Sequence, residues 1–189
     1  MLSQTKKFLR RSASALVVVA VLALPTAAAA QLTIDVTSGT VEPLPIAVPD
    51  FIAPSPDARQ VATDIASVIA GDLERSGLFA PIDKGAFLSR PAALAVRPNF
   101  VNWKPLNAQA LIIGEAKLLP GGKLRTDFRL WDVFAEQPMT GLSLSTSPSN
   151  WRRVAHIIAD AIYERITGES GYFDTRIVYI SETGPLERR

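Results

Sequence analysis

Apolar residues recur every three or four positions in two segments of this chain, which is the spacing of one face of an α-helix. The first segment starts with Ser55, Pro56 and Asp57, a typical helix-start sequence, and stops at Gly77. The second starts at Ser149 or Asn150 and stops at Gly168. The pattern therefore predicts two amphipathic helices, with apolar stripes formed by Val61, Ile65, Val68, Ile69 and Leu73 and by Trp151, Val154, Ala155, Ile158, Ile162 and Ile166.

Runs of β-prone residues predict strands in the rest of the chain. Residues 110–119 and 124–134 flank Pro120, Gly121 and Gly122, so the pattern predicts a hairpin whose glycines turn the chain rather than bind phosphate. Residues 139–146 are expected to form a half-buried strand with Leu142 and Leu144 on its buried face. Shorter strands are predicted at residues 32–36, 44–51, 79–82 and 176–180. Between them, Phe100 and Trp103 are expected to cover the core.

The first thirty residues have the order of a secretory signal peptide. Four basic residues precede an apolar stretch at residues 15–24, and four alanines follow at residues 27–30. This stretch is well short of the roughly twenty residues needed to span a bilayer, so no membrane anchor is expected. The chain has no cysteine that could carry a lipid. We expect cleavage after Ala30 and a mature protein in the periplasm.

Removal of this segment changes the charge balance of the protein. Residues 1–30 hold four of the 20 basic residues and no acidic one, so 16 basic residues remain against 18 acidic ones, a net charge of −2. The remaining basic residues are scattered among carboxylates. Since a nucleic-acid-binding protein needs a concentrated basic face, no nucleic-acid partner is predicted.

Few residues could support catalysis. His156 is the single histidine, and helical spacing places it on a polar face with Arg153 and Asp160, which favours a solvated position. One histidine without cysteine cannot supply a typical zinc site, and no phosphate-binding or dinucleotide-binding motif is present. No cofactor, metal or catalytic residue is therefore predicted.

Two other classes of protein remain open on the residues alone. A secreted hydrolase would use two of the acidic residues Asp127, Asp132 and Glu136, facing each other across a cleft about 5 to 10 Å wide. A periplasmic solute-binding or lectin-like module would need a sizeable apolar pocket with convergent polar groups.

Five stretches closely resemble the amino-terminal domain of the TolB family, a periplasmic component of the Tol-Pal cell-envelope system. They are PIAVP at residues 45–49 followed by Phe51, DLERSGLF at 72–79, FRLWDVF at 128–134, NWRRVAHIIAD at 150–160, and ITG at 166–168 leading to TRIVY at 175–179. The resemblance implies an α/β fold, a mixed sheet packed by two main helices, over residues 31–170. Its likeness to anticodon-binding domains concerns the fold alone and implies no RNA binding. Residues 171–189 would then be a linker and the first strand of a truncated β-propeller.

The same resemblance implies a monomeric adaptor without enzymatic activity. In this family the mature N-terminal segment contacts the C-terminal domain of the inner-membrane protein TolA, and the propeller binds the outer-membrane lipoprotein Pal. The system supports outer-membrane invagination during cell division and envelope integrity. The matching partner residues here are Gln31, Leu32, Thr33, Ile34, Asp35 and Val36. Their alternation suits a strand added to another sheet, although the same residues could equally form the first strand of their own domain.

Overall fold

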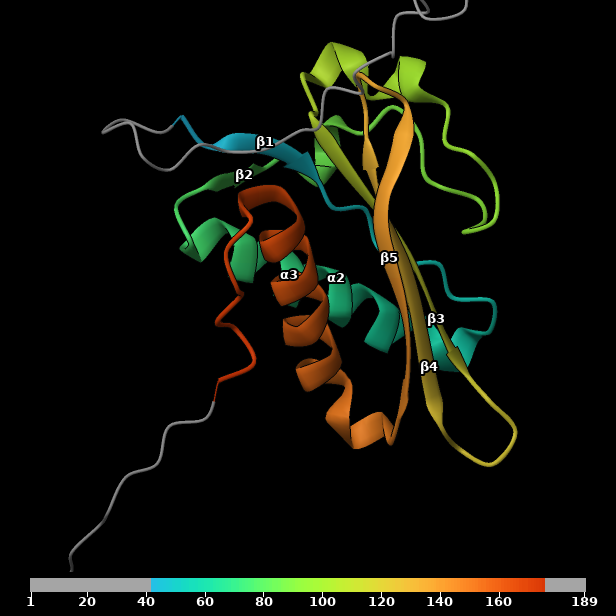
Figure 1. Cartoon of the computed structure of the whole chain (residues 1–189). Helices are drawn as coiled ribbons and strands as arrows, with labels where there is room; N and C mark the ends of the chain where they lie inside the picture. The colour runs from blue at the N-terminus through green and yellow to red at the C-terminus, as the bar shows by residue number, and fades with distance from the viewer. Residues whose placement is uncertain (1–41, 176–189) are drawn as a thin grey trace, which may run out of the picture. The chain divides into compact units, whose positions relative to one another are not determined.

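A five-stranded sheet organises residues 42–175, the part of the chain that this computed structural model describes (Figure 1). The strand order is β2-β1-β3-β4-β5, in which β1 pairs in parallel with β2 and β3, while β3, β4 and β5 pair antiparallel. The mixed α/β sheet predicted from the sequence is confirmed. The strands are β1 Leu44–Ala47, β2 Phe79–Pro81, β3 Ala110–Leu118, β4 Leu124–Asp132 and β5 Gln137–Thr146.

The predicted hairpin is formed by β3 and β4. Leu118 lies opposite Leu124, and Gly121 and Gly122 between them have φ values of 93° and 74°, which only glycine adopts without strain. The second strand ends two residues earlier than predicted, at Asp132. Its carboxylate accepts hydrogen bonds from the backbone N–H groups of the turn that follows, so the chain reverses there.

Two long helices, α2 Arg59–Arg75 and α3 Trp151–Thr167, pack side by side on one face of the sheet (Figure 1). A 3₁₀ turn at Pro56–Ala58 precedes α2, so the α-helix starts later than the proline signal alone indicates. Gly77 and Gly168 follow the two helices with φ values of 74° and 79°. Both predicted helices and both glycine stops are confirmed.

The main hydrophobic core lies between the two helices and the sheet. The predicted stripes supply it, and β1, β3 and β4 add every second residue from the facing side of the sheet. Its largest fully buried side chains are Ile46, Ile65, Ile69, Leu73, Ile112, Leu124, Leu130, Ile158 and Ile162.

A smaller core covers part of the opposite face. The irregular segment between β2 and β3 forms the short 3₁₀ turns Lys84–Ala86, Phe100–Asn102 and Lys104–Leu106. Phe100 and Trp103 from this segment are buried, and the Phe100 ring packs edge-on to Trp131 with centroids 5.8 Å apart. Their predicted role in covering the core is confirmed.

The prediction for the strand at residues 139–146, which corresponds to β5, was partly wrong. Leu144 packs against the main core, but Leu142 is 40% exposed. The cause is the position of β5, which lies at the margin of the sheet and pairs only with β4 among the described residues. An alternating pattern reveals which side of a strand is less polar, but not whether a neighbour covers it.

Several predicted segments lie outside the described residues. These are the signal peptide at residues 1–30, the strand at residues 32–36 and the strand at residues 176–180. Within residues 42–175, neither long helix combines the length and the apolar character required to cross a bilayer.

Candidate functional site

The residues predicted to contact a partner precede the described part of the chain. They are Gln31, Leu32, Thr33, Ile34, Asp35 and Val36. Their role therefore stays a prediction. The described residues do show how the other candidate groups are used.

The three acidic residues of the hydrolase hypothesis do not form a catalytic pair. Asp127 and Asp132 are five residues apart on β4, so they point to opposite faces of the sheet and lie about 17 Å apart along the strand. Glu136 lies in the turn that follows β4. Each carboxylate is instead bonded to neighbouring groups that fix local structure.

Asp127 lies on the face of the sheet opposite the helices. Both of its carboxylate oxygens accept from Nε of Arg125, at 3.2 and 2.9 Å, and next to this pair Lys117 Nζ lies 2.9 Å from Glu115 Oε1. Partial burial favours a higher pKa for Asp127. The hydrogen bonds from Arg125 and Ser143, together with the positive charges of Arg125 and Lys117, outweigh burial and lower the pKa below its usual value.

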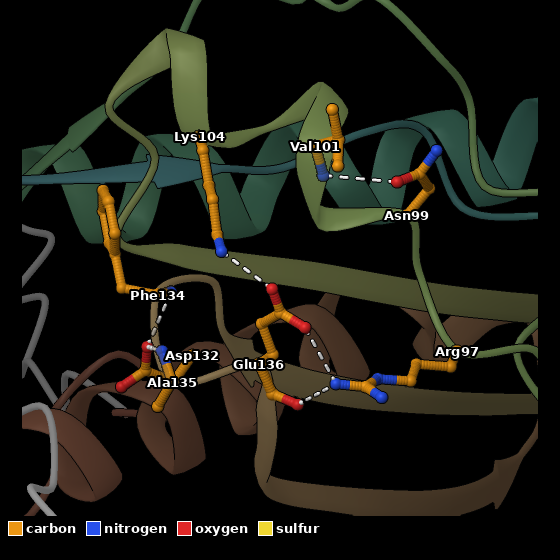
Figure 2. Close-up of polar contacts among 8 residues, drawn as sticks. All are labelled: Arg97, Asn99, Val101, Lys104, Asp132, Phe134, Ala135 and Glu136. Atoms are coloured by element: carbon orange, nitrogen blue, oxygen red, sulfur yellow. Dashed lines mark hydrogen bonds and ion pairs between the residues drawn. The ribbon is translucent and has the colours of Figure 1, made fainter.

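Glu136 connects the turn between β4 and β5 to the loop before β3 (Figure 2). Lys104 Nζ lies 2.7 Å from Oε1 of Glu136, and Arg97 Nη2 donates to both Oε2 and the main-chain oxygen of Glu136 at 3.0 Å. The hydrogen bond from Lys104 is the main cause that lowers the pKa of Glu136. With a φ of 56°, Glu136 adopts a left-handed conformation that these contacts hold in place.

Asp132 stabilises the same turn through hydrogen bonds to its backbone. Its Oδ1 accepts from the backbone N–H groups of Phe134 and Ala135, at 2.9 and 2.8 Å (Figure 2). This short-range arrangement stabilises the reversal between β4 and β5. The three acidic residues singled out in the sequence therefore stabilise β4 and the turn that follows it.

His156 does not occupy the solvated position expected from the sequence. Its Nδ1 lies 2.6 Å from Oδ2 of Asp72 on α2, and Asp72, which also bonds to Arg75, is only 1% exposed. The contact links the two helices. The prediction failed because the helical pattern places a residue on a face without showing which element packs there. Asp72 itself is seven residues after Ile65 and three after Ile69, a spacing that puts it on the buried stripe.

Polar residues on α3 hold the segment that follows the helix. Asp160 accepts from the backbone N–H of Phe173 at 2.7 Å and from that of Asp174 at 3.0 Å. Arg153 Nε in turn donates to both carboxylate oxygens of Asp174, at 3.2 and 3.1 Å. This close approach requires Gly171, where a Cβ would lie 2.3 Å from the Asp160 side chain. These hydrogen bonds therefore hold the segment after Gly168 against α3.

A cavity of about 800 Å³ lies over the polar face of β3, β4 and β5. It opens widely to solvent, and its floor includes Glu115, Lys117, Arg125 and Asp127, whose charges are already paired with one another. This geometry differs from the enclosed apolar pocket that a solute-binding module would need. The described part of the chain thus has the features of an α/β scaffold domain whose ionisable groups fix loops and helices.

Comparison with known proteins identifies the family. Residues 32–139 match the model of the TolB amino-terminal domain, and the chain belongs to the TolB family. The Tol-Pal system protein TolB of Paramagnetospirillum magneticum is 53% identical over 162 residues, which cover 86% of this chain and 36% of that relative. The chain thus spans about a third of the length of this curated relative. The family resemblance noted in the sequence is confirmed.

The fold is also similar to that of a solved relative. The crystal structure of TolB from Acinetobacter baumannii matches with a TM-score of 0.59 and 24% identity, over 76% of this chain and 33% of that structure. At this identity the match concerns the fold alone. It agrees with the mixed sheet and the paired helices described above.

Proposed function

We propose that the chain is a periplasmic adaptor of the Tol-Pal cell-envelope system, linking the inner-membrane protein TolA to the outer-membrane lipoprotein Pal. The observation that carries the proposal is membership of the TolB family, together with 53% identity to a Tol-Pal system protein. Through this link the protein supports outer-membrane invagination during cell division and envelope integrity. The signal-peptide pattern of residues 1–30 supports export to the periplasm.

In this proposal the parts of the chain have separate tasks. Residues 31–170 form the adaptor domain, and residues 171–189 are a linker and the start of a propeller, which in the longer relatives would contact Pal. The role requires no catalysis. Consistent with this, Asp127, Asp132 and Glu136 are all engaged in local ion pairs or turn hydrogen bonds.

The contact with TolA is proposed to use strand addition by residues 31–36. Leu32, Ile34 and Val36 would supply an apolar face, while the backbone would supply most of the hydrogen bonds. Asp35 is the single ionisable side chain of this segment, so binding should depend only weakly on salt. The family match starts at Leu32, inside the proposed contact segment.

Calorimetric titration against the TolA C-terminal domain tests the proposal. A chain lacking residues 31–37 should lose binding while its circular dichroism stays that of the folded domain. Thr33→Pro should also weaken binding if that N–H lies in the intermolecular ladder, because proline removes the main-chain donor. Thr33→Val keeps the donor and a β-branched side chain, and serves as the matched control. Undiminished affinity in the deletion would place the contact elsewhere.

A further inference from the structure

The segment that follows the glycine stop of α3, residues 169–174, reverses direction and runs back beside the helix (Figure 1). A linker between independent units of a chain is typically exposed, and few contacts cross it. This segment is different, because Gly171, Phe173 and Asp174 are half-buried against the domain. Two separate sets of contacts, one aromatic and one polar, hold it there.

The aromatic contacts gather around Tyr163 on α3. The ring of Tyr172 packs edge-on to Tyr163 with centroids 5.5 Å apart, and that of Phe173 packs edge-on with centroids 5.8 Å apart. Tyr163 also contacts Phe79 of β2 at 6.2 Å, and it is only 6% exposed. Edge-to-face pairs of this kind stabilise a contact beyond the area that they bury. Phe173 thereby adds to the margin of the main core.

The polar contacts hold both the backbone and a side chain of the same segment. Asp160 uses one carboxylate oxygen for the N–H of Phe173 and the other for the N–H of Asp174. Arg153, two turns earlier on α3, binds the Asp174 side chain. Partly exposed ion pairs are individually weak. Together these contacts restrict the backbone rotations that a linker would keep, so the direction of the chain is fixed.

The closeness of the segment to α3 depends on Gly171. A Cβ at this position would lie 2.3 Å from Oδ1 of Asp160 and 2.5 Å from its Cα. The helix backbone cannot yield as a flexible side chain would, so any larger residue here must lift the segment away from α3.

We infer that residues 169–174 form a strap that belongs to the folded domain and makes the junction after it rigid. The domain then ends at Asp174 rather than at residue 170, and a fixed connection takes the place of the first part of the expected linker. Because the strap is bound to α3 through its backbone, its side chains and its aromatic rings, α3 sets the direction in which the chain leaves the domain at Thr175. The strap does not depend on the proposed adaptor function.

Backbone ¹⁵N relaxation of the unmodified chain tests this rigidity. The N–H groups of residues 171–174 should have order parameters of about 0.85, equal to those of α3, whereas values below about 0.6 would show a flexible linker and overturn the strap. In Gly171→Ala these values should fall below about 0.6 while those of α3 stay unchanged. Ser170→Ala places the same residue at the exposed neighbouring position and is the matched control. Equal order in Gly171→Ala and the control would refute the role of the close approach.

The direction of the chain at Thr175 can be measured separately, because the sequence contains no cysteine. Glu164→Cys on α3 and Thr175→Cys after the strap are both at exposed positions and can carry a pair of spin labels. Electron paramagnetic resonance should give one narrow distribution of distances between the labels. Adding Gly171→Ala should broaden this distribution, and Ser170→Ala should not. A broad distribution in the labelled chain without either alanine would overturn the rigid junction.

Discussion

Replacement of Gly114 in β3 by alanine tests how tightly the core is packed under the sheet. An added Cβ at this position would lie 2.2 to 2.3 Å from three ring atoms of Phe51, whereas an ordinary contact is 3.4 Å or longer. The ring would have to move by about 1 Å. It has little freedom to do so, because Phe51 is only 4% exposed and the next residue is pinned to β3 by backbone hydrogen bonds of 2.8 and 2.9 Å.

Overpacking of this kind costs about 1–3 kcal/mol in the free energy of unfolding. With a urea dependence of about 1–3 kcal/mol per molar, the midpoint of urea unfolding of Gly114→Ala should fall by roughly 1 M. Gly71→Ala is the control, because its Cβ meets its nearest atom at an ordinary 3.4 Å. It lies inside α2, where alanine in place of glycine should raise the stability by about 0.5–1 kcal/mol.

A double mutant shows whether the Phe51 ring is the cause. Phe51→Leu makes space beneath β3, so in the Gly114→Ala background it should destabilise much less than it does alone, with a coupling energy of about 1 kcal/mol or more. A midpoint of Gly114→Ala equal to that of the unmodified chain would refute the argument from packing. Strict additivity of the two substitutions would show that the cost arises elsewhere.

Three further substitutions test the polar contacts. Asp160→Ala should release the segment after α3, seen as faster amide exchange at the two N–H groups that it binds, whereas Glu164→Ala, an exposed acid on the same helix, should have no effect. Asp72→Ala should lower the free energy of unfolding by about 1.5–3 kcal/mol, because it removes the hydrogen bond between the helices, and unchanged urea unfolding would contradict this. Arg125→Gln should raise the pKa of Asp127, measured by NMR titration of its carboxyl carbon. The hydrogen bond and positive charge of Arg125, which lower this pKa, would no longer offset the effect of burial, which raises it. In the unmodified chain the lowered pKa of Asp127 stabilises the fold at pH values above the ordinary pKa of 3.8, and this stabilisation is lost as the pH falls through the lowered pKa. An identical titration of Asp127 in Arg125→Gln would refute the role of Arg125.

The sequence alone determined the elements whose signals are local. Gly77 and Gly168 end the two helices, and Gly121 and Gly122 form the turn of the hairpin. Each of these positions has a positive φ, which glycine adopts without strain, so the residue type itself predicts the conformation. The apolar stripes were equally readable, since helical spacing joins residues three and four positions apart. The family followed from several such stretches in the right order.

Only the tertiary structure decided which elements meet. Asp72 and His156 are 84 residues apart, and the helical pattern alone predicted a solvated position for His156. Nothing near Gly114 in the sequence shows that the Phe51 ring lies against it. The edge position of β5, which leaves Leu142 exposed, likewise depends on the order of strands in the sheet. Local propensity is set by neighbours along the chain, whereas these contacts are set by how complete elements pack against one another, which a single sequence does not display.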